Sequence, residues 1–552
     1  MTRNGYSIFQ GVATQRCAAK IAQSVPVRPM QVGTSHAGGC RVPQKIFMDH
    51  RFKPEMSGQL PDLGLTLLSG LACLLLAACA VNPVTGNRNF TLLSEADEMR
   101  KGQQAAVEIG KTYEVYDDLP ALQAYVDEIG QKLAKSSHRP KLAYHFTVVD
   151  SPEVNAFALP GGYIYVTRGI LAYLNSEAEL AAVLGHEIGH VTARHSVQQY
   201  SAATAANVAT TVGGIAASVF LPQLGGQLAQ GIQSLLGFGG DVLLSGYGRS
   251  HELEADRLGA EYLARSGYDP QAMIRVIAVL KNQELFDIEV AREEGRKPRR
   301  YHGLFASHPD NDTRLQEVIA EAQQYTKPGV ADDRREEFLH HTQGMIFGDS
   351  ARHGIVRGNT FQHGEMGFTL SFPPEWRIQN QPQEVVATSP DGKALMALSL
   401  LDKARGSPAD LARDRLRLDS AVQILSMTSN GLPAAILNSP PEWDGKPFKA
   451  GVIYLGDNAY LLAGRGDSSE AFDRHREEIS GTIESFRALS DREKKSIKPL
   501  EIKTIRVTRG TTYGSLAAKS PLGSHAENYL RLLNGHYPAG ELVSGQIIKV
   551  VQ

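Results

Sequence analysis

The stretch "AAVLGHEIGHVTARH" (residues 181–195) constrains the fold of this chain more than any other feature. It contains the pattern His-Glu-x-x-His, formed by His186, Glu187 and His190, within a segment of helical apolar spacing. On a helix, residues four apart lie on one face, so both imidazoles can reach one metal ion. Glu187 lies beside them, where a carboxylate can take a proton from water and later deliver it to a leaving amine. The alternative is a surface helix that carries two unconnected histidines.

The positions of the cysteines decide which ligands remain for such a metal. All four cysteines lie at or before Cys79, so the rest of the chain can form no disulfide and no thiolate site. Zinc then takes imidazole nitrogen and carboxylate oxygen. A predicted helix at 251–267 offers Glu252 as a third ligand, with Asp256 one turn on to accept a hydrogen bond from a ligating imidazole. We therefore expect one Zn²⁺ per chain.

His195 raises the question of a third histidine ligand. The metzincin pattern would place glycine at 193 and histidine at 196, whereas this chain has Ala193 and Ser196. If one helix continues through this stretch, His195 points roughly 140° around its axis from His190. The spacing therefore predicts a structural role for His195.

Periodicity along the chain predicts how the helix with the histidines is supported. Helical spacing fits 120–137, and Ser176, with a glutamate three residues later, predicts the start of a helix that runs to about Gln199. Between them, alternating patterns predict strands at 144–150 and 156–167, the latter divided by a Pro-Gly-Gly turn.

The length of the chain and the changes in its helix and strand patterns predict several domains, because 552 residues are too many for one core. The expected fold is multidomain: a mainly α domain with a small β-sheet (80–345), an α+β domain (350–488) and a small βααβ module (500–552). The formal net charge of −2 gives no electrostatic case for a nucleic-acid partner.

The segments "LGHEIGHVTARHS" and "HELEADRLG" together resemble the HtpX and BepA type of zinc peptidase, relatives of the CAAX prenyl protease. The resemblance covers roughly residues 85–325. It implies that 80–345 is a zincin-type metallopeptidase domain with a gluzincin site, in which His186, His190 and Glu252 bind zinc and Glu187 is the catalytic base.

The same resemblance gives roles to two further segments. "SHP" matches an element whose histidine can approach the zinc as an additional ligand or gate, which here is His308; the alternative is an ordinary loop histidine. "NAFALPGGYIYV" resembles the segment beside the cleft. Its exposed strand edge, at Asn155 and Ala156, would hold an extended substrate by β-augmentation.

An apolar run before Cys79 predicts how the protein is attached to a membrane. The run from Leu63 to Ala78 is shorter than a membrane-spanning helix but has the length of a secretory h-region. It ends in "LAAC", which resembles the bacterial lipobox and implies that Cys79 is acylated and becomes the mature N-terminus. The alternative is an internal buried helix.

This interpretation divides the N-terminal region into two parts. Residues 48–79 are expected to form a lipoprotein signal peptide, and 1–47 a non-structural extension, with translation starting at Met48 or Met56. Ala80 is not the aspartate that commonly retains such proteins in the inner membrane. The expected location is therefore the bacterial envelope, facing the periplasm, with the outer membrane favoured.

Residues 195–240 contain no Asp, Glu, Lys or Arg. Glycine and proline interrupt the stretch, so it offers no clean membrane span of about 20 residues. We expect a mobile lid or a partner-contacting surface; membrane insertion is the alternative.

The residues that follow the predicted peptidase domain can be compared with other known modules. No 34-residue helical repeat follows the peptidase, and the sequence gives no role for 350–488. The segment 505–551, with "LNG" and "GQIIKV", looks like a divergent LysM module, which implies binding of peptidoglycan. The alternative is a structural cap without glycan binding.

These features predict a lipid-anchored zinc endopeptidase that cleaves misfolded or misassembled envelope proteins in quality control. One competing interpretation is a non-enzymatic periplasmic chaperone or assembly factor whose zinc site is gated by His308. Another is a cell-wall-associated binding protein that acts through 500–552.

Overall fold

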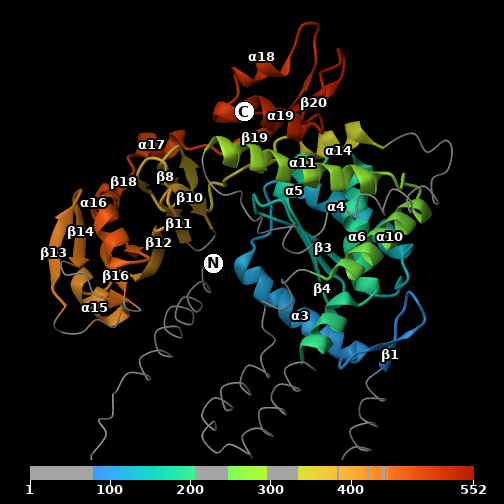
Figure 1. The fold of residues 1–552 in the computed structure, drawn as a ribbon, viewed down its shortest axis with the longest axis horizontal. Helices are drawn as coiled ribbons and strands as arrows, with labels where there is room; N and C mark the ends of the chain where they lie inside the picture. Colours follow the sequence, from blue (N-terminus) through green and yellow to red (C-terminus); the bar gives the residue numbers. More distant parts are fainter. Residues whose placement is uncertain are drawn as a thin grey trace, which may run out of the picture. The chain divides into compact units, whose positions relative to one another are not determined.

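The structure, a computed structural model, describes residues 79–204, 247–294, 333–381, 384–416, 418, 422–437, 442–443 and 446–552 (Figure 1). The residues preceding Cys79, the segment 205–246 and His308 lie outside the described residues. Within the described ranges, no helix combines the length and apolar character needed to cross a bilayer. A short hairpin opens the described chain, with β1 (Cys79–Val81) antiparallel to β2 (Arg88–Phe90).

The peptidase region is built on helices with well-defined starts. Helix α3 (Glu95–Thr112) follows Ser94, and helix α6 (Glu177–Thr192) follows Ser176; each serine accepts a backbone N–H from the first turn. The start predicted at Ser176 is therefore confirmed. The remaining helices of this region are α4 (Pro120–Lys135), α5 (Arg168–Tyr173), α10 (Arg249–Arg265), α11 (Ala272–Glu293) and α14 (Arg335–Thr342).

A three-stranded sheet lies beside these helices in the order β3-β5-β4. Strand β3 (His145–Val149) is parallel to β5 (Tyr163–Thr167), and β4 (Ala156–Leu159) is antiparallel to β5. The turn between β4 and β5 contains two glycines with positive φ, as the Pro-Gly-Gly signal predicts. The order leaves β4 at an edge of the sheet.

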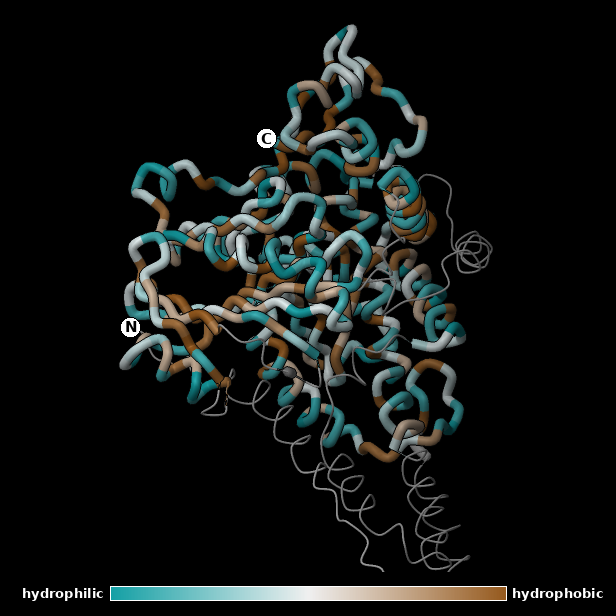
Figure 2. The backbone as a smooth tube through the Cα atoms, turned by 60° about the vertical axis from the view of Figure 1, so that its left-hand side comes forward, coloured by the Kyte–Doolittle hydropathy of each residue, from teal (hydrophilic) through white to brown (hydrophobic). Residues whose placement is uncertain are grey.

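Helix α6 lies at the centre of the peptidase region. All 16 of its residues are buried, and it packs against α4, α10 and α11. Hydrophobic segments gather in the interior, and hydrophilic ones on the outer turns (Figure 2). The histidines of the motif are therefore buried in the core, which the surface-helix alternative does not allow.

The prediction that this helix continues to Gln199 is wrong. Helix α6 ends at Thr192, and Arg194 has φ 59°, in the left-handed region, before helical structure resumes at His195. A left-handed conformation costs a non-glycine residue roughly 1–2 kcal/mol. Two contacts offset that cost: Arg194 Nε donates to Glu98 Oε2 at 2.7 Å, and Nη2 donates to the carbonyl of Leu93.

The sheet-rich region is separate, because its hydrophobic clusters contain residues 361–486 and none of the peptidase region. Its larger sheet is antiparallel, in the order β10-β11-β12-β17-β16-β14-β13 with β15 beside β16; the smaller has the order β18-β9-β8-β7. The strands are β7 (Ile355–Arg357), β8 (Thr360–His363), β9 (Phe368–Ser371), β10 (Arg377–Asn380), β11 (Glu384–Thr388), β12 (Ala394–Lys403), β13 (Ile424–Ser429), β14 (Leu432–Leu437), β15 (Glu442–Trp443), β16 (Lys446–Leu455), β17 (Asn458–Gly466) and β18 (Arg487–Ala488). The helices are α15 (Pro408–Leu416) and α16 (Ser469–Ser485).

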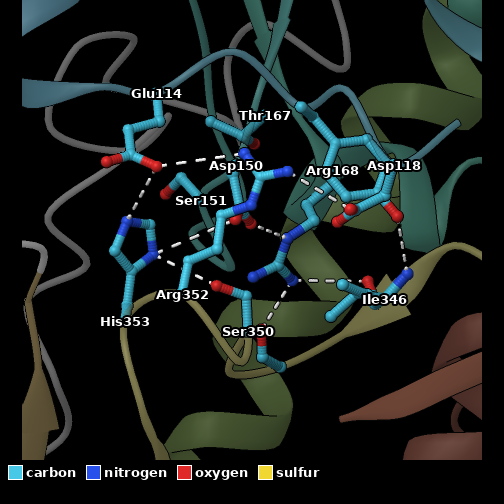
Figure 3. Close-up of polar contacts among 12 residues, drawn as sticks. Glu114, Asp118, Asp150, Ser151, Thr167, Arg168, Ile346, Ser350, Arg352 and His353 are labelled. Atoms are coloured by element: carbon cyan, nitrogen blue, oxygen red, sulfur yellow. Dashed lines mark hydrogen bonds and ion pairs between the residues drawn. The ribbon is translucent and has the colours of Figure 1, made fainter. Parts of the chain in front are cut away.

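A buried ion pair fixes the segment that leads from the peptidase region toward these sheets (Figure 3). Arg168 Nε lies 2.5 Å from Asp150 Oδ1, and both side chains are buried. The same guanidinium donates through Nη1 to the carbonyl oxygens of Ile346 and Gly348. Because a buried charge must be paired and hydrogen-bonded, this arrangement ties strand β6 (Ile346–Phe347) to the end of the peptidase sheet.

The C-terminal segment has the βααβ order that the sequence predicts. After helix α17 (Asp491–Ser496) come strand β19 (Leu500–Arg506), helix α18 (Tyr513–Ala517), a short 3₁₀ turn η3 (Gly523–His525), helix α19 (Ala526–Leu533) and strand β20 (Ile547–Val551). Strand β19 pairs antiparallel with β20 on one side and with β6 on the other. Apolar residues of this segment belong to the same hydrophobic core as α4, α6 and α10.

Lys549 shows how tightly the segment is joined to the peptidase core. Its side chain is fully buried, and Nζ donates to the carbonyl oxygens of Ala172 (2.5 Å) and Leu174 (2.6 Å), at the end of α5. Burial lowers the pKa of the Lys549 amine well below its ordinary value. The amine has enough N–H groups to donate to both carbonyls.

Replacing Lys549 with methionine is expected to lower the free energy of unfolding by about 2–4 kcal/mol, because two buried carbonyls lose their partner. The side-chain stem is largely retained, so the loss reports on the hydrogen bonds. Urea unfolding of the full chain measures it. Lys503→Met is the matched control, since Lys503 lies on the paired strand, is partly exposed and bonds only to Glu501 among the contacts described for it.

The pH dependence of stability provides a second check on Lys549. Its folded pKa lies below the value of 10.5 for an unperturbed lysine, so between the two values the unfolded chain binds more protons. The free energy of unfolding should therefore rise with pH toward 10.5, and the Lys549→Met variant should lack that contribution. Equal pH profiles for the two proteins would contradict a lowered pKa of Lys549 in the folded chain.

Candidate metal centre

The structure brings three side chains from α6 and α10 to one point. His186 Nε2 and His190 Nε2 are 3.0 Å apart, and the Glu252 carboxylate oxygens lie 3.6 Å from the first and 3.5 Å from the second. Ligand atoms bound 2.0–2.1 Å from a tetrahedral zinc are about 3.3 Å apart. The three separations therefore fit one ion, and all three side chains are buried. Among the described residues, no other group of three or more His, Cys, Asp and Glu side chains brings its ligand atoms within 4.8 Å of one another.

Close packing of backbones makes this convergence possible. A β-carbon built on Gly189 of α6 would lie 2.9 Å from the carbonyl oxygen of Ala255 on α10. One built on Gly259 of α10 would lie 3.1 Å from the amide nitrogen of His186. Glycine at these positions lets the helix axes approach more closely than side chains allow, which carries Glu252 to the histidines.

The far nitrogens of both imidazoles are also engaged. His186 Nδ1 lies 2.7 Å from Asp256 Oδ1, and Asp256 is fully buried. His190 Nδ1 lies 2.9 Å from His195 Nδ1. With Nδ1 bonded on each ring, Nε2 is left to face the common point, which is the tautomer that a metal ligand requires.

The position of His195 overturns the expectation that it points away from His190. That expectation assumed one continuous helix, and the left-handed residue at Arg194 ends the helical repeat. His195 is fully buried and its Nε2 lies 3.2 Å from Glu254 Oε2. The hydrogen bond from His195 holds the pKa of Glu254 below its ordinary value, so the carboxylate is ionised.

Aromatic rings enclose the histidines on the side of residues 247–251. Tyr247 stacks on the His190 ring, with centroids 4.0 Å apart. His251 stacks on His195 at 4.3 Å, and burial lowers the pKa of His251 to about 4, so that its ring is neutral at physiological pH. Neutral stacked rings keep the planes of His190 and His195 fixed without adding positive charge beside the metal position.

The other predicted site residues lie as follows. Glu187 is fully buried on α6, next in sequence to His186. Asn155 and Ala156, at the start of edge strand β4, are 8% and 0% exposed. A peptide could pair with that edge only if the groups that cover it move. Cys79 begins strand β1, and His308 lies outside the described residues.

Residues 120–322 match the sequence profile described as peptidase family M48. This part of the chain is similar to peptidase family M48. The resemblance to the HtpX and BepA type of peptidase, inferred from the two motifs, is thereby confirmed. The matched segment contains helices α6 and α10, which carry the candidate ligands, and the β3-β5-β4 sheet.

Curated relatives extend beyond the M48 segment. The beta-barrel assembly-enhancing protease of Escherichia coli (strain K12) is 27% identical over 333 residues, which cover 58% of this chain and 61% of the relative. The protein of the same name from Yersinia pestis is 31% identical over 218 residues, 38% of this chain and 40% of the relative. The mitochondrial metalloendopeptidase OMA1 of Schizosaccharomyces pombe is 34% identical over 192 residues, 34% and 54% respectively. The chain thus spans less than two thirds of the length of each.

Replacing Gly189 with alanine tests whether the close helix contact sets the site. The new methyl group would meet the backbone of α10, so the helices must shift apart. We expect a loss of about 1–3 kcal/mol in unfolding free energy and a weaker affinity for Zn²⁺, measured by competition with a chromogenic chelator.

Gly110→Ala is the matched control for that substitution. Gly110 lies in helix α3, is exposed, and a β-carbon there meets nothing within 4 Å. Alanine in an open helical position is expected to stabilise by about 0.5–1 kcal/mol. If Gly189→Ala behaved like Gly110→Ala, the glycine contact would not be what sets the metal geometry.

Proposed function

We propose that this chain is a zinc-dependent endopeptidase of the bacterial cell envelope. The observation that supports it best is the convergence of His186 Nε2, His190 Nε2 and the Glu252 carboxylate at separations suited to one tetrahedral ion. Two imidazoles and a carboxylate, without a thiolate, are a donor set that zinc accepts in hydrolytic sites. We assign one Zn²⁺ per chain to these three residues, with Asp256 orienting His186.

The reaction is hydrolysis of a peptide bond. When bound, zinc supplies a Lewis acid that polarises the scissile carbonyl and makes water a better nucleophile at neutral pH. Glu187 is the general base: its carboxylate accepts a proton from the attacking water and then donates it to the departing amine nitrogen. The site is buried, so the carboxylate acts in a medium of low polarity, where its charge interacts strongly with the reacting groups.

The substrate is proposed to bind as an extended strand. Strand β4 is the edge of its sheet and packs against α6, the helix that carries Glu187. Once the groups that bury Asn155 and Ala156 move aside, a peptide that pairs with this edge would have its backbone hydrogen-bonded irrespective of its side chains. Such recognition suits unfolded or misassembled proteins, because their backbones are not already paired. Gating of the site by His308 belongs to the same proposal.

The cellular role is proposed from the sequence and from the relatives' names. Acylation of Cys79 would anchor the enzyme, most simply at the outer membrane, facing the periplasm. A relative named for enhancing β-barrel assembly suggests misassembled envelope proteins as substrates. The segment 500–552 would add contact with peptidoglycan, and 80–345 would form the peptidase domain.

Replacing Glu187 with glutamine tests the chemistry. Glutamine keeps the size of the side chain but cannot accept the proton, so cleavage of casein should fall by about 10²–10⁴-fold. Zinc content, measured by atomic emission, should stay at one per chain, because Glu187 is not a proposed ligand. Chelation should abolish cleavage by the parent protein, and added Zn²⁺ should restore it.

The control is Glu261→Gln, on helix α10. Glu261 pairs with Arg257 and Arg265 on the flank of that helix and lies outside the proposed site. It should cleave casein at the parental rate. Zinc bound at one per chain, with no turnover of casein or of an unfolded envelope protein, would instead favour a non-enzymatic chaperone or assembly factor.

A further inference from the structure

A chain of two side chains, His195 and Glu254, leads away from the proposed metal ligand His190. His190 Nδ1 lies 2.9 Å from His195 Nδ1, and His195 Nε2 lies 3.2 Å from Glu254 Oε2. Both histidines are essentially inaccessible to solvent, whereas the Glu254 side chain is 23% exposed. The chain therefore runs from the metal position to the edge of solvent and ends on a carboxylate.

The positions of the protons in this chain follow from the chemistry of imidazole. A metal ligand needs an unprotonated Nε2, so His190 must carry its proton on Nδ1. That proton points at His195 Nδ1, which must then be an unprotonated acceptor. His195 consequently carries its own proton on Nε2 and donates it to Glu254. Where Glu254 Oε2 accepts from His195 Nε2, only one arrangement of the two protons fits both contacts.

We propose that Glu254 and His195 are positioning residues, which hold His190 in the tautomer and orientation that bind the metal. The proposal rests on the proposed metal site. It assigns to His195 a role that the spacing of the motif did not suggest, and it gives the middle acidic residue of "HELEAD" a function distinct from those of Glu252 and Asp256.

The two proposed histidine ligands are thus supported in different ways by one helix. His186 bonds directly to a carboxylate of α10, Asp256. The Nδ1 of His190 is linked to a carboxylate of the same helix through the ring of His195. Without Glu254, the tautomer of His195 would be set only by its contact with His190, and no carboxylate contact described for His195 would favour the form that accepts from His190. In the wrong one, two N–H groups would face each other across 2.9 Å, which disfavours the metal-binding form of His190.

The surroundings fix the intermediate ring. Glu254 and His251 are three residues apart on α10, so they share one flank of that helix. His195 lies against this flank, stacked on His251 while its Nε2 reaches Glu254. On the opposite side, the left-handed turn at Arg194, held by Glu98, delivers His195 to this position. The position of the His195 ring is therefore set both by helix α10 and by the turn at Arg194.

A double-mutant cycle on metal affinity tests the proposal independently of proteolysis. Zn²⁺ affinity of the full chain is measured by competition with a chromogenic chelator for Glu254→Ala, His195→Ala and the double variant. Each single change should weaken binding by about 10–100-fold, as loss of a group that orients a ligand usually does. Because Glu254 acts through His195, the double variant should bind no more weakly than His195→Ala.

Conservative variants separate positioning from general destabilisation. Glu254→Gln and His195→Gln each keep a hydrogen-bond acceptor at the right place, so both should bind Zn²⁺ more tightly than the alanine variants. The visible spectrum of the Co²⁺-substituted protein, which reports the ligand field, should change in Glu254→Ala. It should remain parental in Glu261→Ala, the control on the same helix.

The outcomes distinguish this proposal from the proposed function. If the parent binds Zn²⁺ and Glu254→Ala binds it equally well, or if the two alanine substitutions are additive, the positioning role is excluded and the metal site stands. If the parent binds no Zn²⁺, the metal site itself is excluded, and the role of Glu254 and His195 with it.

Discussion

The contact between helices α6 and α10 is the constraint on which the rest of the site depends. The candidate ligand atoms come from both helices, so their separations of about 3.3 Å depend on how closely α6 and α10 pack. Gly189 and Gly259 make that approach possible, because a side chain at either position would meet the backbone of the opposite helix. The same approach sets Asp256 against His186 and Glu254 against His195. The contact between α6 and α10 therefore positions both the proposed ligands and the groups that orient them.

Much of this arrangement could be predicted from local sequence, where the physical cause is also local. Ser176 marked the start of the ligand helix because its side chain accepts a backbone N–H of the first turn, and the four-residue spacing placed both histidines on one face. The sheet beside them followed from alternation and from the Pro-Gly-Gly turn. Asp256 was nominated by its spacing from Glu252, and its oxygen lies 2.7 Å from His186 Nδ1.

What could not be predicted depended on contacts distant in sequence. The orientation of His195 was derived for a straight helix, yet Glu98, almost a hundred residues earlier, holds Arg194 in the conformation that ends the helix. The signal available for the helix contact was a glycine directly before each ligand histidine, Gly185 and Gly189, which places glycines on one flank of α6. Interpreting that signal required knowing that Gly185 faces another glycine, Gly259, and that Gly189 faces the backbone of Ala255.

In the C-terminal segment, too, the order of the elements could be predicted but their packing could not, and this packing affects the helix that carries the proposed ligands. Its βααβ order followed from the sequence, but its packing did not: a lysine within the apolar run "IIKVV" bonds the end of α5. Leu174, one of its acceptors, precedes the cap of α6 by two residues, and Arg335 bonds the carbonyl of Asn175 between them. The segment thus braces the start of the helix that carries the proposed ligands. Removing residues 500–552 would therefore disturb the peptidase as well as any glycan contact, so peptidoglycan binding must be probed through exposed side chains of this segment while Lys549 stays in place.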